Sequence, residues 1–428
     1  MARTIRPVSG IAGTLSLPGD KSISHRYAML AALARGRSVL TNYSTGADCA
    51  STLACLGSLG ARWERQSNRV EIEGCGLQGL SAPRAPLDAG NSGSTIRMLS
   101  GILAGQPFES VIQGDESLSK RPMQRIMTPL RRMGAEIQAG GGQFPPLVIR
   151  GRPLQPIHYE LPVASAQVKS CVLLAGLYAR GLTEVVEPVE TRNHTEIALL
   201  RFGADVRVDG SSRSVVGYPS LTGCSLRVPS DLSSAVFFLA AALLLPDSDL
   251  LIDGVGLNPT RSAVLQVLRR MGAHIEVHPE SDSGGEASGT LRVRGTGRLE
   301  GGLISGETTA AVIDEIPMLA VLGAASERGL RIRDAGELRV KETDRIATVA
   351  ANLRQMGVEV TEHETGMDIQ GGCNLRAAQL DSCGDHRVAM AFAVGALAAD
   401  GDSLLEGAAA AAVSFPEFFD VLASVTRG

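Results

Sequence analysis

Leu130-Arg-Arg-Met-Gly134-Ala135 is a phrase that recurs, with small changes, along the whole chain. The other copies are Leu56-Gly-Ser-Leu-Gly60-Ala61, Leu200-Arg-Phe-Gly203-Ala204, Leu268-Arg-Arg-Met-Gly272-Ala273 and Leu353-Arg-Gln-Met-Gly357-Val358. In each copy an apolar segment of helical period stops at a glycine, a residue that readily takes the left-handed conformation past a helix end. The spacing of about 70 residues indicates a repeated supersecondary unit.

A second, more apolar helix is predicted upstream of each phrase, and each of these helices has a polar entrance. The entrances are Lys21-Ser-Ile-Ser-His-Arg26, Asn91-Ser-Gly-Ser-Thr-Ile-Arg97, Ser165-Ala-Gln-Val-Lys169, Asp231-Leu-Ser-Ser234, Asp314-Glu315 and Asp385-His-Arg387. Short strands are expected between the two helices of each unit, at 38–43, 109–114, 183–188, 249–254, 330–335 and 403–408. The sequence therefore predicts an α/β protein of six βαβαββ units, each about 71 residues long. The sixth unit closes on a helix at 414–425.

The six units are expected to form two domains of three units. Leu17-Pro-Gly-Asp-Lys-Ser22 and Val228-Pro-Ser-Asp-Leu-Ser233 read as copies of one another, half a chain apart. We place one domain at 19–228 and the other at 1–18 plus 229–428. A chain of 428 residues is long enough for two or three domains.

The composition excludes several classes of partner. The hydrophobic fraction of 44% and charged fraction of 20% are typical of a soluble globular protein. A net charge of −4 and an aromatic fraction of only 4% argue against nucleic acid or an anionic membrane as a partner. No apolar run is long enough to span a membrane, and no secretion signal begins the chain. Seven cysteines without a Cys-x-x-Cys pair predict a reducing cytoplasm and no structural metal.

Cations recur at the predicted helix entrances. The first helices carry Lys21, Arg26, Arg97, Lys169, His386 and Arg387, and the second helices carry Lys120, Arg121, Arg192, Arg261, Lys341 and Arg345. A helix N-terminus is already an anion site, so a cation placed there costs energy until an anion binds. We expect a pocket for small, multiply anionic ligands. The alternative is that these cations are solvated first-turn residues and that the polar neighbours are ordinary caps.

Two carboxylates among these cations are candidates for proton transfer. Asp314 opens the fifth first helix, and Glu342 precedes the second helix of the same unit. Carboxylates surrounded by cations stay ionised, which suits a general base or proton shuttle. The alternative for Glu342 is a plain ion pair with Arg345 across the first turn. Motifs of nucleotide-binding proteins, serine hydrolases and zinc proteases do not occur.

Four longer motifs occur in order along the chain. They are Leu17-Pro-Gly-Asp-Lys-Ser-Ile-Ser-His-Arg26, Asp88-Ala-Gly-Asn-Ser-Gly-Ser-Thr-Ile-Arg97, Arg339-Val-Lys-Glu-Thr-Asp-Arg-Ile346 and Asp385-His-Arg387. With these motifs the chain, from about residue 7 to residue 425, resembles the EPSP synthase family of enolpyruvyl transferases. The resemblance implies a two-domain inside-out α/β barrel, each domain made of three βαβαββ repeats, with the active site in the interdomain cleft.

The resemblance also implies the reaction and the residues that carry it out. The enolpyruvyl group of phosphoenolpyruvate passes to the 5-hydroxyl of shikimate 3-phosphate, and phosphate leaves, by addition and elimination through a tetrahedral intermediate. The step belongs to the shikimate pathway of aromatic amino acid biosynthesis and uses no metal or organic cofactor. The implied catalytic residues are Lys21, Asp314, Glu342 and His386. The implied ligands of shikimate 3-phosphate are Lys21, Ser22, Arg26, Ser165, Ala166, Gln167, Arg192, Asp314 and Lys341. The implied ligands of phosphoenolpyruvate are Lys21, Asn91, Gly93, Arg121, Gln167, Arg345 and Arg387.

The chain departs from its relatives at two places. Some relatives have a lysine just before the final Ser-Phe-Pro, where this chain has Ala412-Val413. Several of its motifs resemble the second class of the family, which often tolerates glyphosate, yet Gly93 stands where tolerant members frequently have alanine. We therefore expect glyphosate to inhibit the protein in competition with phosphoenolpyruvate, and we expect a monomer.

Two other functions compete with this interpretation. The UDP-N-acetylglucosamine enolpyruvyl transferases resemble the same fold but place a reactive cysteine in the second unit, whereas this chain has none between Cys75 and Cys171. The repeats could also form a noncatalytic scaffold that binds anions. Retention of Lys21, Asp314, Glu342 and Arg387 argues against that second alternative.

Overall fold

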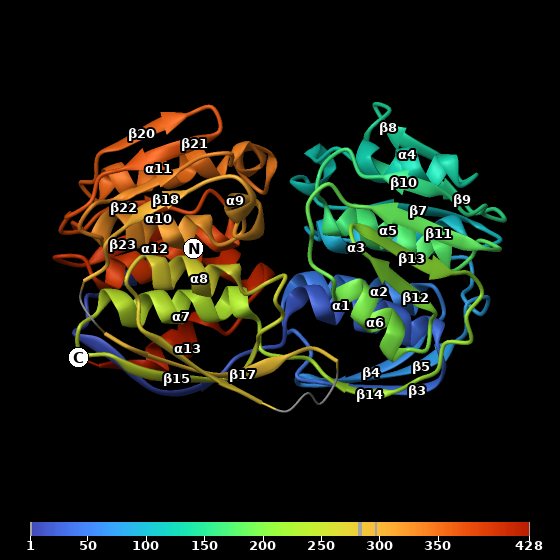
Figure 1. Ribbon diagram of the computed structural model, residues 1–428, viewed down its shortest axis with the longest axis horizontal. Helices are drawn as coiled ribbons and strands as arrows, with labels where there is room; N and C mark the ends of the chain where they lie inside the picture. The colour runs from blue at the N-terminus through green and yellow to red at the C-terminus, as the bar shows by residue number, and fades with distance from the viewer. Residues whose placement is uncertain (1, 281–284, 296–297, 428) are drawn as a thin grey trace. The chain divides into compact units, whose positions relative to one another are not determined.

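A computed structural model describes residues 2–280, 285–295 and 298–427 (Figure 1). The chain divides into two compact units. The early unit comprises Gly19–Val228 together with residues 285–286, and the late unit comprises 2–18, 229–280 and the described part of 287–427. The two breaks on either side of the early unit therefore fall directly after Pro18 and directly before Pro229.

The early unit is built from three pairs of helices. The first helices are α1 (Lys21–Leu33), α3 (Gly93–Ala104) and α5 (Ala166–Gly176), and the second helices are α2 (Ala47–Ser58), α4 (Gln124–Arg132) and α6 (His194–Arg201). Three four-stranded sheets accompany them. In spatial order these are β14 (Ser225–Arg227), β3 (Arg35–Thr41), β5 (Arg69–Cys75) and β4 (Arg62–Gln66); β6 (Leu87–Asp88), β7 (Glu109–Gln113), β9 (Phe144–Arg150) and β8 (Glu136–Gly140); and β10 (His158–Glu160), β11 (Leu182–Val186), β13 (Ser212–Val216) and β12 (Val206–Asp209).

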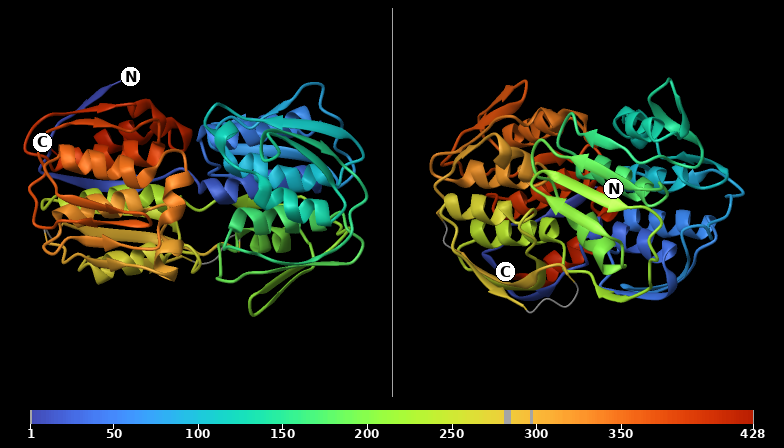
Figure 2. Two further views of the ribbon diagram at one scale, coloured as in Figure 1. Left: turned by 90° about the horizontal axis from the view of Figure 1, so that it is seen from above. Right: turned by 45° about the vertical axis from the view of Figure 1, so that its right-hand side comes forward.

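The late unit repeats this plan. Its first helices are α7 (Leu232–Leu244), α10 (Ile316–Ala325) and α12 (His386–Leu397), and its second helices are α8 (Ala263–Arg270), α11 (Arg345–Gln355) and α13 (Phe418–Val425). Its sheets are β16 (Ile275–Pro279), β17 (Ser288–Arg294), β15 (Asp249–Gly256), β2 (Gly10–Ser16) and β24 (Thr426–Arg427); β18 (Gly302–Ile304), β19 (Leu330–Ile332), β21 (Gly366–Ile369) and β20 (Val360–His363); and β1 (Arg3–Ile5), β23 (Ser403–Glu406) and β22 (Gln379–Asp381). Figure 2 shows the sheets on the outer side of the helices within each unit.

The predicted repeat is confirmed in its elements. A strand lies at each of the six expected positions, between the two helices of its unit, and the recurring glycines all have positive φ, from 83° at Gly357 to 102° at Gly134. Each of the six sheets contains one parallel pair with antiparallel neighbours, as β6, β7, β9 and β8 illustrate. The sixth unit closes on α13, as expected, and its sheet is completed by β1 from the start of the chain, which pairs antiparallel with β23.

Two strands belong to one compact unit, although the helix that follows each of them in the chain belongs to the other unit. β2 precedes α1 but pairs in parallel with β15 of the late unit. β14 precedes α7 but pairs in parallel with β3 of the early unit. Each compact unit is therefore completed by a strand that the chain forms just before it crosses, which explains why the two Pro-containing segments are alike in sequence.

The first helices form the buried centre of each unit. In α12 all twelve residues are buried, and in α7 all but the last one are. Small residues allow close packing: a Cβ added at Gly101 would lie 2.2 Å from the carbonyl oxygen of Cys171, so α3 and α5 approach at this point. Because such helices are buried along their length, polar groups can act only at their ends. In the part of the chain that the structure describes, no helix is long and apolar enough to cross a membrane.

Candidate active site

The candidate residues gather at helix N-termini that are fixed by capping side chains. The Asp20 carboxylate accepts a hydrogen bond from the Ile23 amide at 2.9 Å and so starts α1. The corresponding caps are Ser92 for α3, Ser165 for α5, Asp231 for α7, Asp344 for α11 and Asp385 for α12. Short polar caps satisfy one of the free amides and set the residue at which the helix begins. The neighbouring polar side chains are thereby held at the N-terminal end of the helix, which we call the helix mouth.

Arg26 is a buried cation that joins three helices of the early unit. Its Nε donates to Thr195 Oγ1 at 2.7 Å, and its Nη2 donates to Ser170 Oγ at 2.8 Å. Its Nη1 donates to the Ser22 carbonyl at 2.7 Å. Burial lowers the pKa of Arg26 to about 10, and the charge of Glu196 opposes that shift. The guanidinium therefore remains a cation at neutral pH, next to Ser22.

Lys21 lies in the first turn of α1 and is paired with a carboxylate that the sequence analysis did not select. Its Nζ is 2.8 Å from Oδ2 of Asp48, which lies in the first turn of α2. Asp48 is buried, whereas the Lys21 side chain is 19% exposed. The Lys21 ammonium is therefore paired with a buried carboxylate, while part of its side chain remains exposed.

Arg121 and Asn91 form the mouth of α3. Arg121 Nη2 donates to Asn91 Oδ1 at 2.8 Å and to Ser117 Oγ at 3.1 Å. Gly93, the first residue of α3, leaves room here, since a Cβ at this position would lie 2.6 Å from Nη1 of Arg97 and 3.6 Å from Nη1 of Arg121. Gly93 thus allows two guanidinium groups to approach the first turn of the helix.

Gln167 links the mouths of α3 and α5. Its Oε1 accepts from Arg97 Nη1 at 2.8 Å, and its Nε2 donates to Ser94 Oγ at 3.0 Å. Ser165 caps α5 and Ala166 is its first residue. Arg192 precedes α6, and its positive charge acts on Arg26. The early unit therefore joins Ser22 and Arg192 to Arg26, and Asn91 to Arg121, through hydrogen bonds or charge.

Asp314 in the late unit lies between two cations. Its Oδ1 is 3.6 Å from Lys341 Nζ and 3.8 Å from Arg345 Nη1. The Asp314 side chain is 17% exposed and the Lys341 side chain 24% exposed. Both can therefore meet a solute, and the carboxylate of Asp314 lies between two positive charges.

Arg345 lies within 4 Å of three carboxylates of the late unit, those of Asp314, Glu342 and Asp385. Its Nε donates to Asp385 Oδ2 at 2.7 Å, and its Nη2 donates to Glu342 Oε2 at 2.5 Å. The pKa of Arg345 is raised, because the charges of Glu342 and Asp385 outweigh the effect of burial. Burial opposes ionisation of Asp385, yet the charge of Arg345 holds the pKa of that carboxyl below its ordinary value of 3.8. Glu342 therefore forms the ion pair with Arg345 across the first turn that the sequence offered as the alternative to a role in proton transfer.

Arg387 enters a network at the mouths of α7, α10 and α12. Its Nη1 donates to the Asp314 carbonyl at 2.8 Å, and its Nη2 donates to Ser233 Oγ at 3.3 Å. Ser233 also bonds to Glu315 and to Arg261. His386, the first residue of α12, is buried. The late unit therefore connects Asp314 to Arg387 through backbone and side-chain contacts.

Comparisons with known proteins place the chain in one family. The sequence model of the family described as EPSP synthase (3-phosphoshikimate 1-carboxyvinyltransferase) matches residues 5–422. The chain belongs to the EPSP synthase family. A relative in Solibacter usitatus named 3-phosphoshikimate 1-carboxyvinyltransferase is 58% identical over all of both chains, and one in Koribacter versatilis with the same name is 52% identical over 99% of both.

Solved structures show the same fold. EPSP synthase of Acinetobacter baumannii matches with a TM-score of 0.89 and 41% identity, covering 99% of this chain and 98% of that one. The enolpyruvyl transferase NikO of Streptomyces tendae matches with a TM-score of 0.80 at 19% identity, covering 99% and 96% of the two chains. The second likeness concerns the fold alone.

Not every cation predicted at a helix entrance of this EPSP synthase family member lies at the candidate site. Lys120 pairs on the surface with Glu116 at 2.6 Å. Lys169 is fully buried against Glu187 and Glu196. Lys120 fits the alternative of a solvated cation, whereas the burial of Lys169 between two carboxylates fits neither expectation.

The partners that hold the cations are not among the residues predicted from the sequence. Asp48, Ser170 and Thr195 hold Lys21 and Arg26 in the early unit. Ser233 and Glu315 hold Arg387 in the late unit. A signal was available for Ser233, because it occupies the place of Ser22 in the copied segment. The other partners have no spacing that marks them.

His25 begins a buried chain of hydrogen bonds that reaches the cap of α3. His25 Nδ1 lies 2.7 Å from Thr52 Oγ1, Thr52 Oγ1 lies 2.7 Å from Thr95 Oγ1, and Thr95 Oγ1 donates to Ser92 Oγ at 2.7 Å. Burial lowers the pKa of His25 from 6.5 to about 3, and the charge of Asp48 opposes the shift. The imidazole is therefore neutral at neutral pH and plays a structural part.

The neutral state of His25 predicts acid sensitivity. Because the unfolded state takes up a proton near pH 6.5 and the folded state does so only near 3, stability is complete above the higher value and falls as the pH drops between them. From pH 7.5 to pH 5 this residue should remove about 2 kcal/mol from the free energy of unfolding. Urea unfolding of the wild type and of His25→Asn at both pH values measures it. An equal loss in the two proteins would contradict the assignment.

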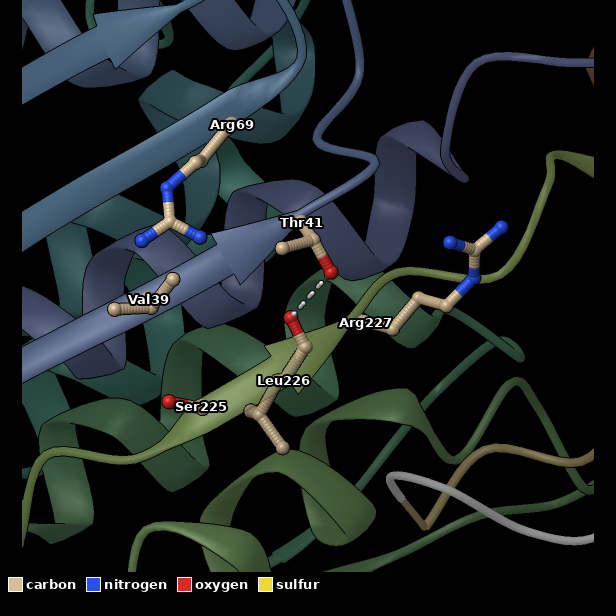
Figure 3. A pocket seen from close by; sticks show the side chains of 6 residues that line it. All are labelled: Val39, Thr41, Arg69, Ser225, Leu226 and Arg227. Atoms are coloured by element: carbon tan, nitrogen blue, oxygen red, sulfur yellow. Dashed lines mark hydrogen bonds between the residues drawn. The ribbon is translucent and has the colours of Figure 1, made fainter.

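A pocket of about 310 Å³ lies away from these helix mouths (Figure 3). Its lining residues come from β3, β5 and β14 and are Val39, Thr41, Arg69, Ser225, Leu226 and Arg227. The guanidinium of Arg69 is paired with Glu71 at 2.6 Å, so the positive charge of Arg69 in this pocket is already neutralised by a carboxylate. Among the described residues, no group of three or more His, Cys, Asp or Glu side chains could hold a metal ion.

Proposed function

We propose that the helix mouths of the early and late units bind the two substrates of an enolpyruvyl transfer and carry out the reaction. A member of the EPSP synthase family, the chain transfers the enolpyruvyl group of phosphoenolpyruvate to shikimate 3-phosphate in the shikimate pathway. The observation that carries the site proposal is the set of arginines, each at most 9% exposed, that capped helix ends hold in place: Arg26, Arg121, Arg345 and Arg387.

The charges of the substrates suit this set of residues. Each substrate carries one phosphate and one carboxylate, and planar guanidinium groups bind both kinds of anion with two parallel hydrogen bonds. We assign Ser22, Arg26, Ser165, Ala166, Gln167, Arg192 and Lys341 to shikimate 3-phosphate. We assign Asn91, Gly93, Arg121, Gln167, Arg345 and Arg387 to phosphoenolpyruvate, with Lys21 between the two substrates. Cations held before the substrates arrive need little reorganisation when charge develops in the transition state.

Proton transfer falls to the carboxylates and to Lys21. In the addition step the 5-hydroxyl oxygen bonds to C2 of phosphoenolpyruvate, and Asp314 accepts the hydroxyl proton. The methylene carbon gains a proton from Glu342 or Lys21, with His386 near. In the elimination step that methyl carbon returns a proton and the C–O bond to phosphate breaks. Asp314 suits its part because its carboxylate is partly exposed and lies 3.6 Å from Lys341 and 3.8 Å from Arg345.

A phosphate-release assay tests the proposed function. We expect release only when shikimate 3-phosphate and phosphoenolpyruvate are both present, and a product that carries an enol ether by proton NMR. UDP-N-acetylglucosamine is the acceptor to compare, because it belongs to the rival transferases. Release with that acceptor, or no release with shikimate 3-phosphate, would overturn the proposal and leave the rival or the anion-binding scaffold.

Glyphosate should inhibit in competition with phosphoenolpyruvate, at concentrations below millimolar. Its chain between phosphonate and carboxylate is one atom longer than that of phosphoenolpyruvate, so the space beside Gly93 matters more to the inhibitor. In Gly93→Ala the new Cβ would lie 2.6 Å from Arg97 Nη1. We expect the inhibition constant to rise at least about tenfold more than the KM for phosphoenolpyruvate.

Gly256→Ala is the control for that variant, because its Cβ would meet its nearest neighbour at an ordinary 3.5 Å. It should leave both constants near the wild-type values. Inhibition of the wild type only at millimolar glyphosate, or an equal rise of both constants in Gly93→Ala, would refute the expectation. We further propose a monomer that works in the cytoplasm, and sedimentation equilibrium tests the first of these two statements.

A further inference from the structure

A buried ion cluster in the early unit lies outside the proposed chemistry. Lys169 Nζ in α5 is 2.9 Å from Glu187 Oε2 and 2.7 Å from Glu196 Oε1. Arg213 Nε in β13 is 3.8 Å and 3.5 Å from the same two oxygens. The four side chains are at most 4% exposed, so water does not compensate their charges. These two buried cations and two buried carboxylates therefore stabilise one another, and Arg213 also pairs with the exposed Glu190 at 3.0 Å.

The cluster holds both ends of the segment 187–196. Glu187 lies where the chain leaves β11, and its Oε1 accepts hydrogen bonds from the amide and the hydroxyl of Thr191. Lys169 Nζ also lies 3.5 Å from the Thr191 carbonyl. Glu196 lies in the first turn of α6, at the other end. The residue directly after Thr191 is Arg192, so the backbone that carries Arg192 is fixed from both sides.

The same cluster lies beside the groups that hold Arg26. Ser170 follows Lys169 in α5, and Thr195 precedes Glu196 in α6. Their hydroxyl oxygens are 2.6 Å apart, and both accept from the Arg26 guanidinium. The ion pair between Lys169 and Glu196 therefore fixes the separation of the two helices at the point where Arg26 is held.

We propose that Lys169 is a positioning residue that orients Arg26 and Arg192 toward shikimate 3-phosphate. This inference rests on the proposed function of those two arginines. A buried ion cluster contributes little stability compared with apolar residues of the same size, but it fixes one geometry, because its charges accept few other arrangements. Lys169 binds no substrate itself, and its effect passes through the segment 187–196.

The test uses the double variant Lys169→Met/Glu196→Gln. It removes one cation and one carboxylate, so the charges of Arg213 and Glu187 that remain in the buried cluster still cancel. Calorimetry with shikimate 3-phosphate alone should show a dissociation constant weakened roughly tenfold or more. With saturating shikimate 3-phosphate, kcat and the KM for phosphoenolpyruvate should stay within about threefold of the wild type. Amide hydrogen exchange over 187–193 should be faster. Val172→Ala, equally buried in α5, is the control: it should lower Tm without moving that dissociation constant.

A folded double variant with wild-type binding and wild-type exchange over 187–193 would overturn the proposal. If the double variant does not fold, Thr191→Val takes its place, since it removes only the hydroxyl bonded to Glu187. Weaker binding of shikimate 3-phosphate with unchanged kcat supports the proposal, and unchanged binding overturns it. A wild type that does not bind shikimate 3-phosphate refutes the proposed function instead, and hydrogen exchange then still decides whether Lys169 orders the segment.

Discussion

Asp314→Asn should lower kcat roughly a thousandfold, because the amide cannot accept the hydroxyl proton of the acceptor. Asparagine keeps the size of the side chain and its contacts with Lys341 and Arg345, which lie 3.6 and 3.8 Å from Oδ1. The KM values for both substrates should therefore change less than about tenfold. Steady-state phosphate release measures all three constants.

Asp402→Asn is the matched control for the loss of turnover. Asp402 belongs to the same unit, and its side chain is 58% exposed next to Arg6. Its replacement should leave kcat unchanged, since an exposed ion pair has little influence elsewhere. If Asp314→Asn retained more than about a tenth of the wild-type kcat, Asp314 would not be the base for this step.

Arg345→Met should cause the largest loss of stability, about 3–5 kcal/mol, because it leaves the carboxylates of Glu342 and Asp385 without their buried partner. Arg345 is 1% exposed and its Nε lies 2.7 Å from Asp385. The variant should also lose phosphoenolpyruvate binding. Arg354→Met in the same helix is the control: Arg354 is 46% exposed, so its loss should cost less than about 1 kcal/mol.

The pH dependence distinguishes a lost ion pair from a lost packing contact. In the wild type the pKa of Asp385 is lowered by Arg345 against the effect of burial, so its stabilising contribution is complete above 3.8 and is lost as the pH falls through the folded value. Without Arg345, burial should raise that pKa above 3.8. Protonation of Asp385 at low pH then removes the unpaired buried charge that destabilises the variant. The difference in free energy of unfolding should therefore shrink toward pH 4. A constant difference would contradict the assignment.

The periodic elements of this chain could be predicted from sequence because each has a local cause. Gly60, Gly134, Gly203, Gly272 and Gly357 end helices in the left-handed conformation that glycine adopts most easily. The caps Asp20, Ser92 and Asp385 likewise act within three residues of their helix starts. The cations next to these caps followed from the same local patterns.

Long-range partners could not be predicted in this way. β1 pairs with β23 and completes the sixth sheet, although hundreds of residues separate the two strands. Asp48 pairs with Lys21 from another helix. The carboxylates that neutralise Lys169 are those of Glu187, directly after β11, and Glu196, in α6. Charge alone therefore marks helix entrances, whereas only the tertiary structure shows which cations remain available for a ligand.

The proposed function requires cations of both units for phosphoenolpyruvate, and the KM for this substrate in Arg121→Ala and in Arg387→Ala tests that requirement most directly. Arg121 belongs to the early unit and Arg387 to the late unit. With shikimate 3-phosphate saturating, each variant alone should raise that KM at least about tenfold. A wild-type KM in either variant would show that only one unit binds phosphoenolpyruvate, and would contradict the account.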